Sequence, residues 1–184
     1  PAAAAKLPRE AKELRAYAAS DLMRARFGSC WVLMDRDDAA DDNAEHLYRY
    51  LLRNGKADKA FFVLREESAD WNRLKAEGFK LIPYSSRDHV AAVVNASVVI
   101  SSHAADFVLW PAPKPWIADL VSYRFVFLQH GVTKNDVSHV LGRRPMRLFI
   151  TSAHGEFNSI ANVSSNYLFS QREVRLTGFP RHDA

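Results

Sequence analysis

The sequence predicts an α/β protein built on a doubly wound, mainly parallel sheet of about seven strands. Short runs of β-branched and aromatic residues alternate with segments whose apolar residues recur at helical spacing. The run 125–128, Phe-Val-Phe-Leu, has no polar position, which is typical of a parallel strand buried on both faces. At 184 residues, with 48% hydrophobic and 25% charged residues, the chain is expected to form one domain with a substantial core.

The expected elements follow from these patterns in chain order. Residues 5–27 are predicted as a helix because apolar side chains recur every three or four positions from Leu7 to Ala25. Ser68 is a plausible N-cap for the helix expected at 68–76. The other expected helices are 45–52, 88–95 and 156–163. The expected strands are 31–34, 60–64, 79–82, 97–101, 125–128, 148–151 and 174–176. We divide the chain into an N-terminal helix, 1–27, and a sheet domain, 28–184. We expect the whole chain to be a piece of a longer protein.

Composition narrows the classes of function. A single cysteine, Cys30, excludes an internal disulfide and favours a reducing cytosol. No apolar run approaches the roughly 20 residues that cross a bilayer, and no signal peptide is expected. The net charge of +4 is modest, but basic residues gather at 6–26 and in the C-terminal third. Such clusters indicate phosphate-bearing ligands or an anionic membrane surface, and the alternative is a surface that only contacts solvent. The sequence contains no GxGxxG, Walker or GxSxG motif, and no nucleic-acid partner is expected.

Histidines follow several of the expected strands. His103, His130 and His154 come at or just after the ends of three late strands, and His182 follows the last one. Ligands of open parallel sheets bind beyond the carboxyl ends of the strands, so these imidazoles are candidates for a general base, a phosphate contact or a metal ligand. The alternative for each histidine, taken singly, is an ordinary loop residue. Their separation by 24 to 28 residues is unlike the spacing of zinc ligands, and we expect no metal.

His130 is the strongest candidate for catalysis. Gly131 lets a substrate approach the backbone beside it, and Thr133 and Lys134 can donate hydrogen bonds to an anion. A helix starting near Asp136 would add free backbone N–H groups for a phosphate.

A second cluster is acidic and follows the first expected strand, DRDDAADDNAE at 35–45. Either Asp41 or Asp42 caps the helix that follows, or these carboxylates hold substrate hydroxyls or a neighbouring loop.

Four segments together resemble one known family. They are DRDDAADDNAEHLYRYL (35–51), FVFLQHGVTKND (125–136), LFITSAHGEFNSI (148–160) and LTGFPRHD (176–183). In this order they resemble the CDP-glycerol glycerophosphotransferases, the polymerases and primases of teichoic acid and capsule polymers, over roughly residues 30–184.

The resemblance implies a GT-B transferase, in which two Rossmann-like domains face each other across a cleft. This chain would be the N-terminal, acceptor-side domain, and a C-terminal domain absent from the chain would hold the CDP-linked donor. His130 would be the catalytic base, and Arg181 would meet the pyrophosphate. The full set of candidate substrate-binding residues is His103, Gly131, Thr133, Lys134, Asp42, Asn43, His154, Arg181, His182 and Asp183.

The implied reaction moves a polyol phosphate, with glycerol phosphate as first choice, from a CDP-linked donor to a hydroxyl of a lipid-linked or polymeric acceptor, without a cofactor. The chain reads QHGVTKN where the best-known teichoic acid polymerases read WHGTPLK, and ribitol phosphate is equally compatible. The alternatives are a GT-B enzyme acting on a nucleotide sugar (a capsule glycosyltransferase or epimerase) and a non-catalytic module that binds anionic ligands. The expected location is cytoplasmic and peripheral at the inner face of the bacterial membrane, where helix 5–27 either rests on anionic lipid or packs on the domain.

Overall fold

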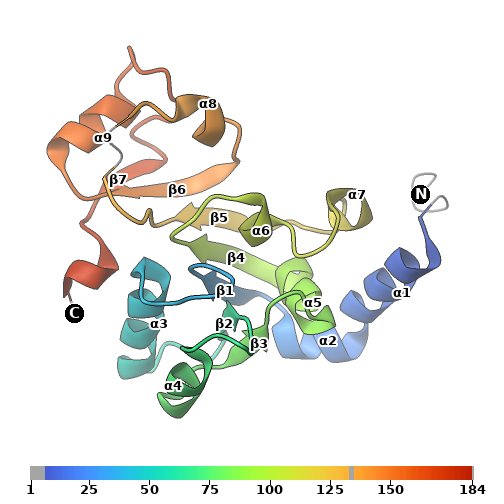
Figure 1. Ribbon diagram of the computed structural model, residues 1–184. Coiled ribbons are helices and arrows are strands. Elements are labelled where there is room, and N and C mark those ends of the chain that lie inside the picture. Colours follow the sequence, from blue (N-terminus) through green and yellow to red (C-terminus); the bar gives the residue numbers. More distant parts are fainter. Residues whose placement is uncertain (1–6, 133–134, 184) are drawn as a thin grey trace.

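The computed structural model describes residues 7–132 and 135–183. Seven parallel strands form one sheet in the order β3-β2-β1-β4-β5-β6-β7, which confirms the predicted fold class. The strands are β1 (Cys30–Met34), β2 (Ala60–Leu64), β3 (Leu81–Pro83), β4 (Ala96–Ser101), β5 (Arg124–Phe127), β6 (Met146–Thr151) and β7 (Val174–Leu176). Figure 1 shows this sheet running through the molecule with helices on both sides.

The helices of the described chain cover the two faces unequally. They are α1 (Arg9–Ala18), α2 (Asp21–Phe27), α3 (Asn43–Arg53), α4 (Trp71–Ala76), α5 (Arg87–Asn95), α6 (Asp106–Leu109), α7 (Lys114–Ile117), α8 (Ser138–Leu141), α9 (His154–Ala161) and the 3-10 helix η2 (Pro180–Asp183). One core joins α2, α5 and α9 to one face of the sheet, around Phe27, Phe125 and Phe149. The other core places α3 and α4 on the opposite face, around Tyr48 and Phe62.

Strand alternation explains this division. In β5, Phe125 and Phe127 belong to the first core, whereas Val126 packs against the second core and Leu128, just beyond the strand, belongs to it. Because side chains point alternately to the two faces, a strand that is apolar at every position requires apolar cover on both.

The prediction of one continuous helix over residues 5–27 is wrong. The chain forms α1 and α2, and the break falls at Ala19 and Ser20. Ser20 is the N-cap of α2, where its Oγ accepts a hydrogen bond from the N–H of Met23 at 3.4 Å. As a result Leu22, which was expected on the apolar stripe, is 70% exposed. The helical period continues across residues 19–20, so spacing alone could not locate the turn.

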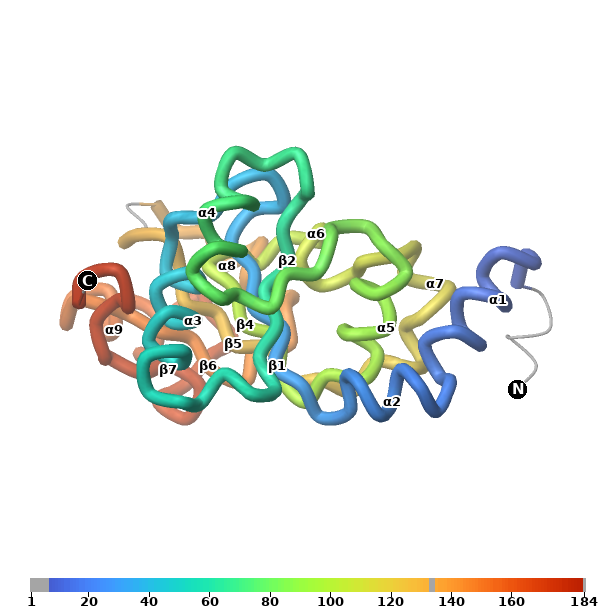
Figure 2. Tube along the Cα trace, turned by 90° about the horizontal axis from the view of Figure 1, so that it is seen from below, coloured from blue at the N-terminus to red at the C-terminus, as the bar shows by residue number. Residues whose placement is uncertain are grey.

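The N-terminal helices pack on the domain. Ala11 and Ala18 of α1 are fully buried, and Arg15 pairs with Asp119 at 2.6 Å. Figure 2 shows α1 at one end of the molecule and the carboxyl end, beside α3, at the other. No helix within residues 7–132 and 135–183 is long and apolar enough to cross a membrane.

Two smaller predictions also need correction. Helix α4 begins at Trp71 with Asp70 in the N-cap position, and Ser68 instead accepts the backbone N–H of Asp70 at 3.2 Å. The helix expected near Asp136 is α8, a single turn that begins at Ser138, and the Asp136 carboxylate accepts the N–H of Ser138 at 2.8 Å. That turn is too short to supply the phosphate-binding helix terminus that the sequence suggested.

Candidate functional site

The candidate residues gather where the chain reverses its direction across the sheet. From β1 the chain steps outward to β2 and β3, then returns to β4 on the other side of β1 and continues to β7. The loops that leave β1 and β4 therefore diverge at the carboxyl ends of the strands. This is the position at which doubly wound sheets bind ligands.

His130 and His103 form a stacked pair at this edge. Their ring centroids are 4.7 Å apart with an interplanar angle of 13°, and they follow the neighbouring strands β5 and β4. His130 is exposed, and its Nδ1 lies 3.3 Å from the carbonyl oxygen of Ser102. An Nδ1–H that donates to this carbonyl leaves Nε2 as the unprotonated, accepting nitrogen.

His103 has the more enclosed environment of the two. Burial and the positive charges of His130 and Arg36 lower its pKa, against an opposing effect of Asp42. Its Nε2 is buried and has no hydrogen-bond partner in the described chain. A neutral His103 can stack on His130 without competing for a proton at neutral pH.

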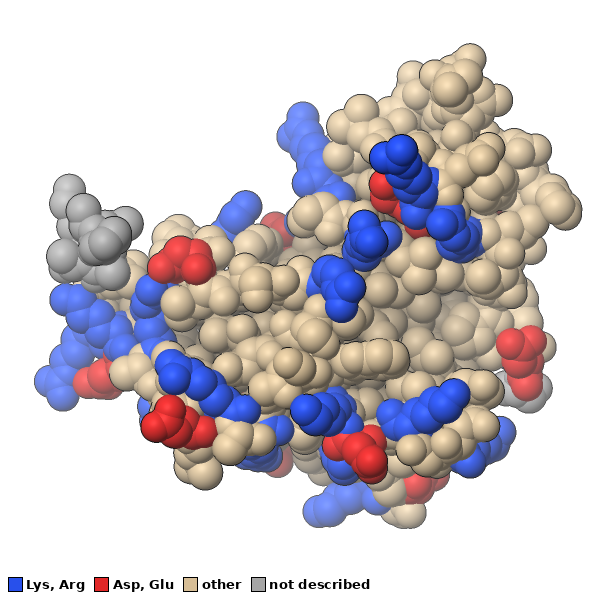
Figure 3. All heavy atoms as spheres, turned by 180° about the vertical axis from the view of Figure 1, so that it is seen from behind, with Lys and Arg blue, Asp and Glu red and all other residues tan. Residues whose placement is uncertain are grey.

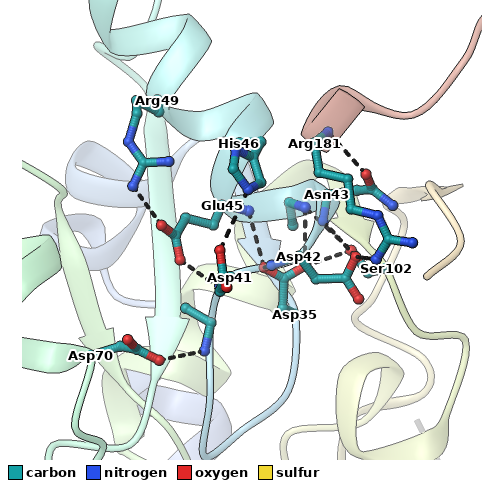
Figure 4. A network of polar contacts seen from close by, with 12 residues as sticks. Asp35, Asp41, Asp42, Asn43, Glu45, His46, Arg49, Asp70, Ser102 and Arg181 are labelled. Atoms are coloured by element: carbon teal, nitrogen blue, oxygen red, sulfur yellow. Dashed lines mark hydrogen bonds and ion pairs between the residues drawn. The ribbon is translucent and has the colours of Figure 1, made fainter. Parts of the chain in front are cut away.

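Asp35, directly after β1, organises the start of α3 and was not singled out from the sequence. Its fully buried carboxylate accepts hydrogen bonds from the N–H groups of Asp42 (3.2 Å), Ala44 (2.9 Å) and Glu45 (3.0 Å), and from the hydroxyl of Ser102 (2.5 Å). Burial raises the pKa of Asp35 to about 6, which leaves the carboxylate ionised at neutral pH. Figure 4 shows Asp35 below the first turn of α3, where it satisfies helix donors that have no partner within the helix.

Asn43 connects three segments that are distant in sequence. Its buried side chain donates from Nδ2 to the carbonyl of Gln129 at 2.7 Å, and its Oδ1 accepts the backbone N–H of Arg181 at 3.1 Å. The carbonyl of Gln129 belongs to the peptide bond that leads into His130. One amide at the start of α3 thus sets the position of both the His130 loop and η2.

Arg181 also reaches the start of α3 through its side chain. Its Nη1 donates to Oδ1 of Asp42 at 3.1 Å, and Asp42 occupies the N-cap position of α3 (Figure 4). This confirms the capping interpretation for Asp42. The guanidinium also lies beside Gly131, since Nη2 of Arg181 is 3.7 Å from the position that a Cβ of Gly131 would occupy. A cationic group therefore faces the backbone next to His130.

Gln129 attaches the His130 loop to β6 and α9. Its backbone has φ 60°, a left-handed conformation that costs a residue with a side chain of order 1 kcal/mol or more. The buried side chain donates from Nε2 to the carbonyl of Ile150 (3.0 Å) and to Oε1 of Glu156 (2.8 Å). These bonds to β6 and α9 hold the strained turn that presents His130. Gln129 was quoted in the QHG segment but was not identified as an anchor.

Most of the other carboxylates of the acidic cluster have structural partners. Glu45 is 1% exposed and is bound by Arg49 and Arg73, and Asp37 pairs with Arg65. Burial alone would raise the pKa of Glu45, but the hydrogen bonds from Arg73 and Arg49 lower it to about 2.

We expect Glu45→Gln to lower the free energy of unfolding by about 3 kcal/mol at pH 7. The folded pKa of Glu45 is depressed, so this stability is fully present above the unfolded value of 4.5 and is lost as the pH falls towards 2. Urea unfolding of wild type and variant at several pH values checks this. The difference between the two should shrink below about pH 4.5, and an equal difference at all pH values would contradict the ion-pair explanation.

The remaining candidates lie apart from the histidine pair or outside the described residues. His154 is exposed at the first residue of α9, and no hydrogen bond or ring contact of the described chain links it to His130. His182 packs beside Phe179 at 5.4 Å between centroids, and Asp183 is exposed. Thr133 and Lys134 lie outside the described residues. Within the described ranges, no group of three His, Cys, Asp or Glu side chains is placed to hold a metal ion.

The assembled site has the parts needed to move a proton beside an anion. It contains an exposed imidazole whose Nδ1 faces a backbone carbonyl, a glycine that leaves its backbone open, and a guanidinium beside that glycine. These features suit the deprotonation of a hydroxyl next to a phosphate-bearing ligand.

The chain is similar in sequence to known proteins of one family. Residues 24–184 match the sequence model of a family described as CDP-glycerol:poly(glycerophosphate) glycerophosphotransferase. The chain is 40% identical over 157 residues to the minor teichoic acid biosynthesis protein GgaB of Bacillus subtilis (strain 168). That alignment covers 83% of this chain and 17% of GgaB, so the chain spans about a sixth of the length of this relative. The chain belongs to the CDP-glycerol:poly(glycerophosphate) glycerophosphotransferase family.

Proposed function

We propose that the full-length protein transfers a polyol phosphate, with glycerol phosphate as first choice, from a CDP-linked donor to an acceptor hydroxyl in the synthesis of a teichoic acid or capsule-like polymer. This chain would supply the acceptor side and the catalytic base. The observation that carries the proposal is the exposed His130, held by Ser102 and stacked on His103 at the ligand edge of the sheet. Family membership and the role that the name of GgaB states, in minor teichoic acid biosynthesis, support the choice of chemistry.

In this mechanism Nε2 of His130 accepts the proton of the acceptor hydroxyl. The hydroxyl oxygen attacks the β-phosphorus of the donor, a new P–O bond forms, and the bond to the CMP oxygen breaks so that CMP leaves. The hydrogen bond of Nδ1 to Ser102 favours the tautomer that this step requires. The imidazole is free again once its proton passes to solvent.

Arg181 is proposed to face the donor pyrophosphate. Its guanidinium has Nη1 on Asp42 and Nη2 beside Gly131, so it is already oriented before a donor binds. Asn43 would act as a positioning residue, because its two hydrogen bonds hold backbone groups of the His130 loop and η2. His103, Gly131, Thr133, Lys134, Asp42, His154, His182 and Asp183 stay predictions as substrate contacts.

Arg181→Ala in the full-length protein is expected to lower kcat/KM for the CDP-linked donor about 10–100-fold, because a charge-assisted, bidentate contact is lost. Arg181→Lys should recover only part of this, since an ammonium cannot form the paired contact. Steady-state CMP release at varied donor concentration measures the effect. Arg143→Ala, at an exposed arginine outside the candidate site, is the matched control; equal losses in the two variants would contradict the assignment.

The proposed setting is the cytoplasmic face of the bacterial membrane, with a lipid-linked or polymeric acceptor. Basic residues of α1 and α2 are exposed on the domain surface, among them Lys12 and Arg24. Sedimentation of the full-length protein with vesicles that differ only in anionic lipid tests this location, and binding that is independent of anionic lipid would contradict it.

CMP release from CDP-glycerol and from CDP-ribitol by the full-length protein, with a lipid-linked acceptor present, tests the function. Release from one donor supports the transfer reaction and identifies the polyol. No release from either donor, together with turnover of a nucleotide sugar, would assign the protein to a different transferase or to an epimerase. Binding of anionic polymer without any turnover would indicate a non-catalytic module.

A further inference from the structure

A broad groove lies on the sheet face that carries α3. Its lining is largely apolar and includes neither His103 nor His130. Its volume is about 1110 Å³. Three neighbouring strands supply its apolar floor, through Val98, Ile100, Val126, Leu128, Leu148 and Ile150. Leu47 and Tyr50 of α3 form one wall, and residues 177–180, which lead from the carboxyl end of β7 to η2 beside α3, also border the groove. In Figure 3 this side of the molecule shows a hollow of uncharged surface with basic side chains around it.

The handedness of the chain explains why no described helix covers this floor. Right-handed crossovers from β1 to β2 and β3 place α3 and α4 on this face. From β4 to β7 the chain steps in the opposite direction, so the same handedness places its crossovers, including α9, on the other face. The connections of this domain therefore leave half of the α3 face bare, although parallel strands with apolar residues at every position are normally covered on both sides.

Arginines line the groove near the amino ends of the strands. Arg124 begins β5, Arg147 is the second residue of β6, Arg172 precedes β7 and Arg53 ends α3. None of the four forms an ion pair within the described part of the chain, where other arginines such as Arg49 and Arg73 are paired. Unpaired cations thus surround one end of an apolar floor.

We propose that this groove receives an amphipathic α-helix from another part of the same polypeptide, with acidic residues in its last turn. The helix would lie antiparallel to the strands, as α3 does beside it, and would place its apolar stripe on the floor. Its carboxyl end would then reach the four arginines, which complement acidic side chains, the free carbonyls and the negative end of the helix dipole. This chain spans only 17% of GgaB, and a family member of that length has ample sequence to supply such a helix.

Site-specific photo-crosslinking in the full-length protein tests the proposal. Val126→benzoylphenylalanine places the reactive ketone on the floor, and Val163→benzoylphenylalanine, at a fully exposed valine, is the control. The protein is prepared as a mixture of ¹⁴N and ¹⁵N molecules, so that a crosslink within one molecule differs in mass from one between copies. We expect Val126 to crosslink within one molecule, to a segment with apolar residues at helical spacing and acidic residues at its end.

Charge reversal tests the role of the arginines. Arg124→Glu with Arg147→Glu should lower the crosslink yield at least about tenfold, whereas the pair Lys12→Glu with Arg24→Glu, on α1 and α2, should leave it unchanged. Maleimide labelling of Val126→Cys offers a second measurement, with protection in the parent protein and reaction after charge reversal. A crosslink between copies, a lipid adduct, or a freely reactive Val126→Cys without any crosslink would each overturn the proposal.

Discussion

His130→Ala in the full-length protein is expected to lower kcat for CMP release about 10²–10⁴-fold, the range that a positioned general base contributes. The side chain is exposed, and within the described residues its one hydrogen bond goes to the Ser102 carbonyl, so its removal should leave the fold intact. Single-turnover and steady-state assays with saturating donor and acceptor measure the loss. The donor KM should change little, because the imidazole acts on the acceptor.

His139→Ala provides the matched control. His139 is an exposed histidine on α8, and its side chain forms no hydrogen bond in the described chain. It should keep parental turnover, and both variants should show parental urea unfolding. Full activity of His130→Ala would exclude His130 as the base, and an equal loss in His139→Ala would point to a general disturbance of the loop.

Asp35→Ala is expected to destabilise the domain by about 3–5 kcal/mol, one of the largest effects available to a single substitution here. The change leaves the backbone N–H groups of Asp42 and Glu45 and the Ser102 hydroxyl without their acceptor in a dry environment. The N–H of Ala44 keeps only its longer bond to the Ser102 hydroxyl oxygen, at 3.2 Å. Urea unfolding measures the global loss. Hydrogen exchange over residues 42–53 measures the loosening of α3 directly.

Asp38→Ala is the comparison for this experiment. Asp38 lies in the same acidic segment but makes no side-chain hydrogen bond or ion pair in the described chain, and its removal should change stability by less than about 0.5 kcal/mol. Because Asn43 at the start of α3 holds the His130 loop, Asp35→Ala should also reduce turnover at temperatures where the domain stays folded. Unchanged protection of α3 in Asp35→Ala would contradict its role as the acceptor for this helix.

Much of the fold could be predicted from local sequence pattern. The strand Ala60–Leu64 was located to the residue, because an apolar run bounded by polar turns has few alternatives. The short strand Val174–Leu176 was located equally well, although Arg175 lies between its two apolar residues. Helix ends were predicted less well, since Ser20 and Asp70 occupy the N-cap positions of helices whose predicted extent began before them. The family and the position of His130 at a strand end also followed from short motifs.

The geometry of the site needed the tertiary structure. The sequence placed four histidines after strands, but only the sheet order and loop conformations bring His103 onto His130 and leave His154 and His182 apart from them. The buried bonds of Asp35, Asn43 and Gln129 join residues that are 27 to 138 positions apart in the sequence, and no periodicity encodes such partners. Which segments form strands, and which side chains follow them, are thus determined by the local sequence. Which groups meet, and which half of the sheet stays uncovered, depends on chain crossovers and long-range packing.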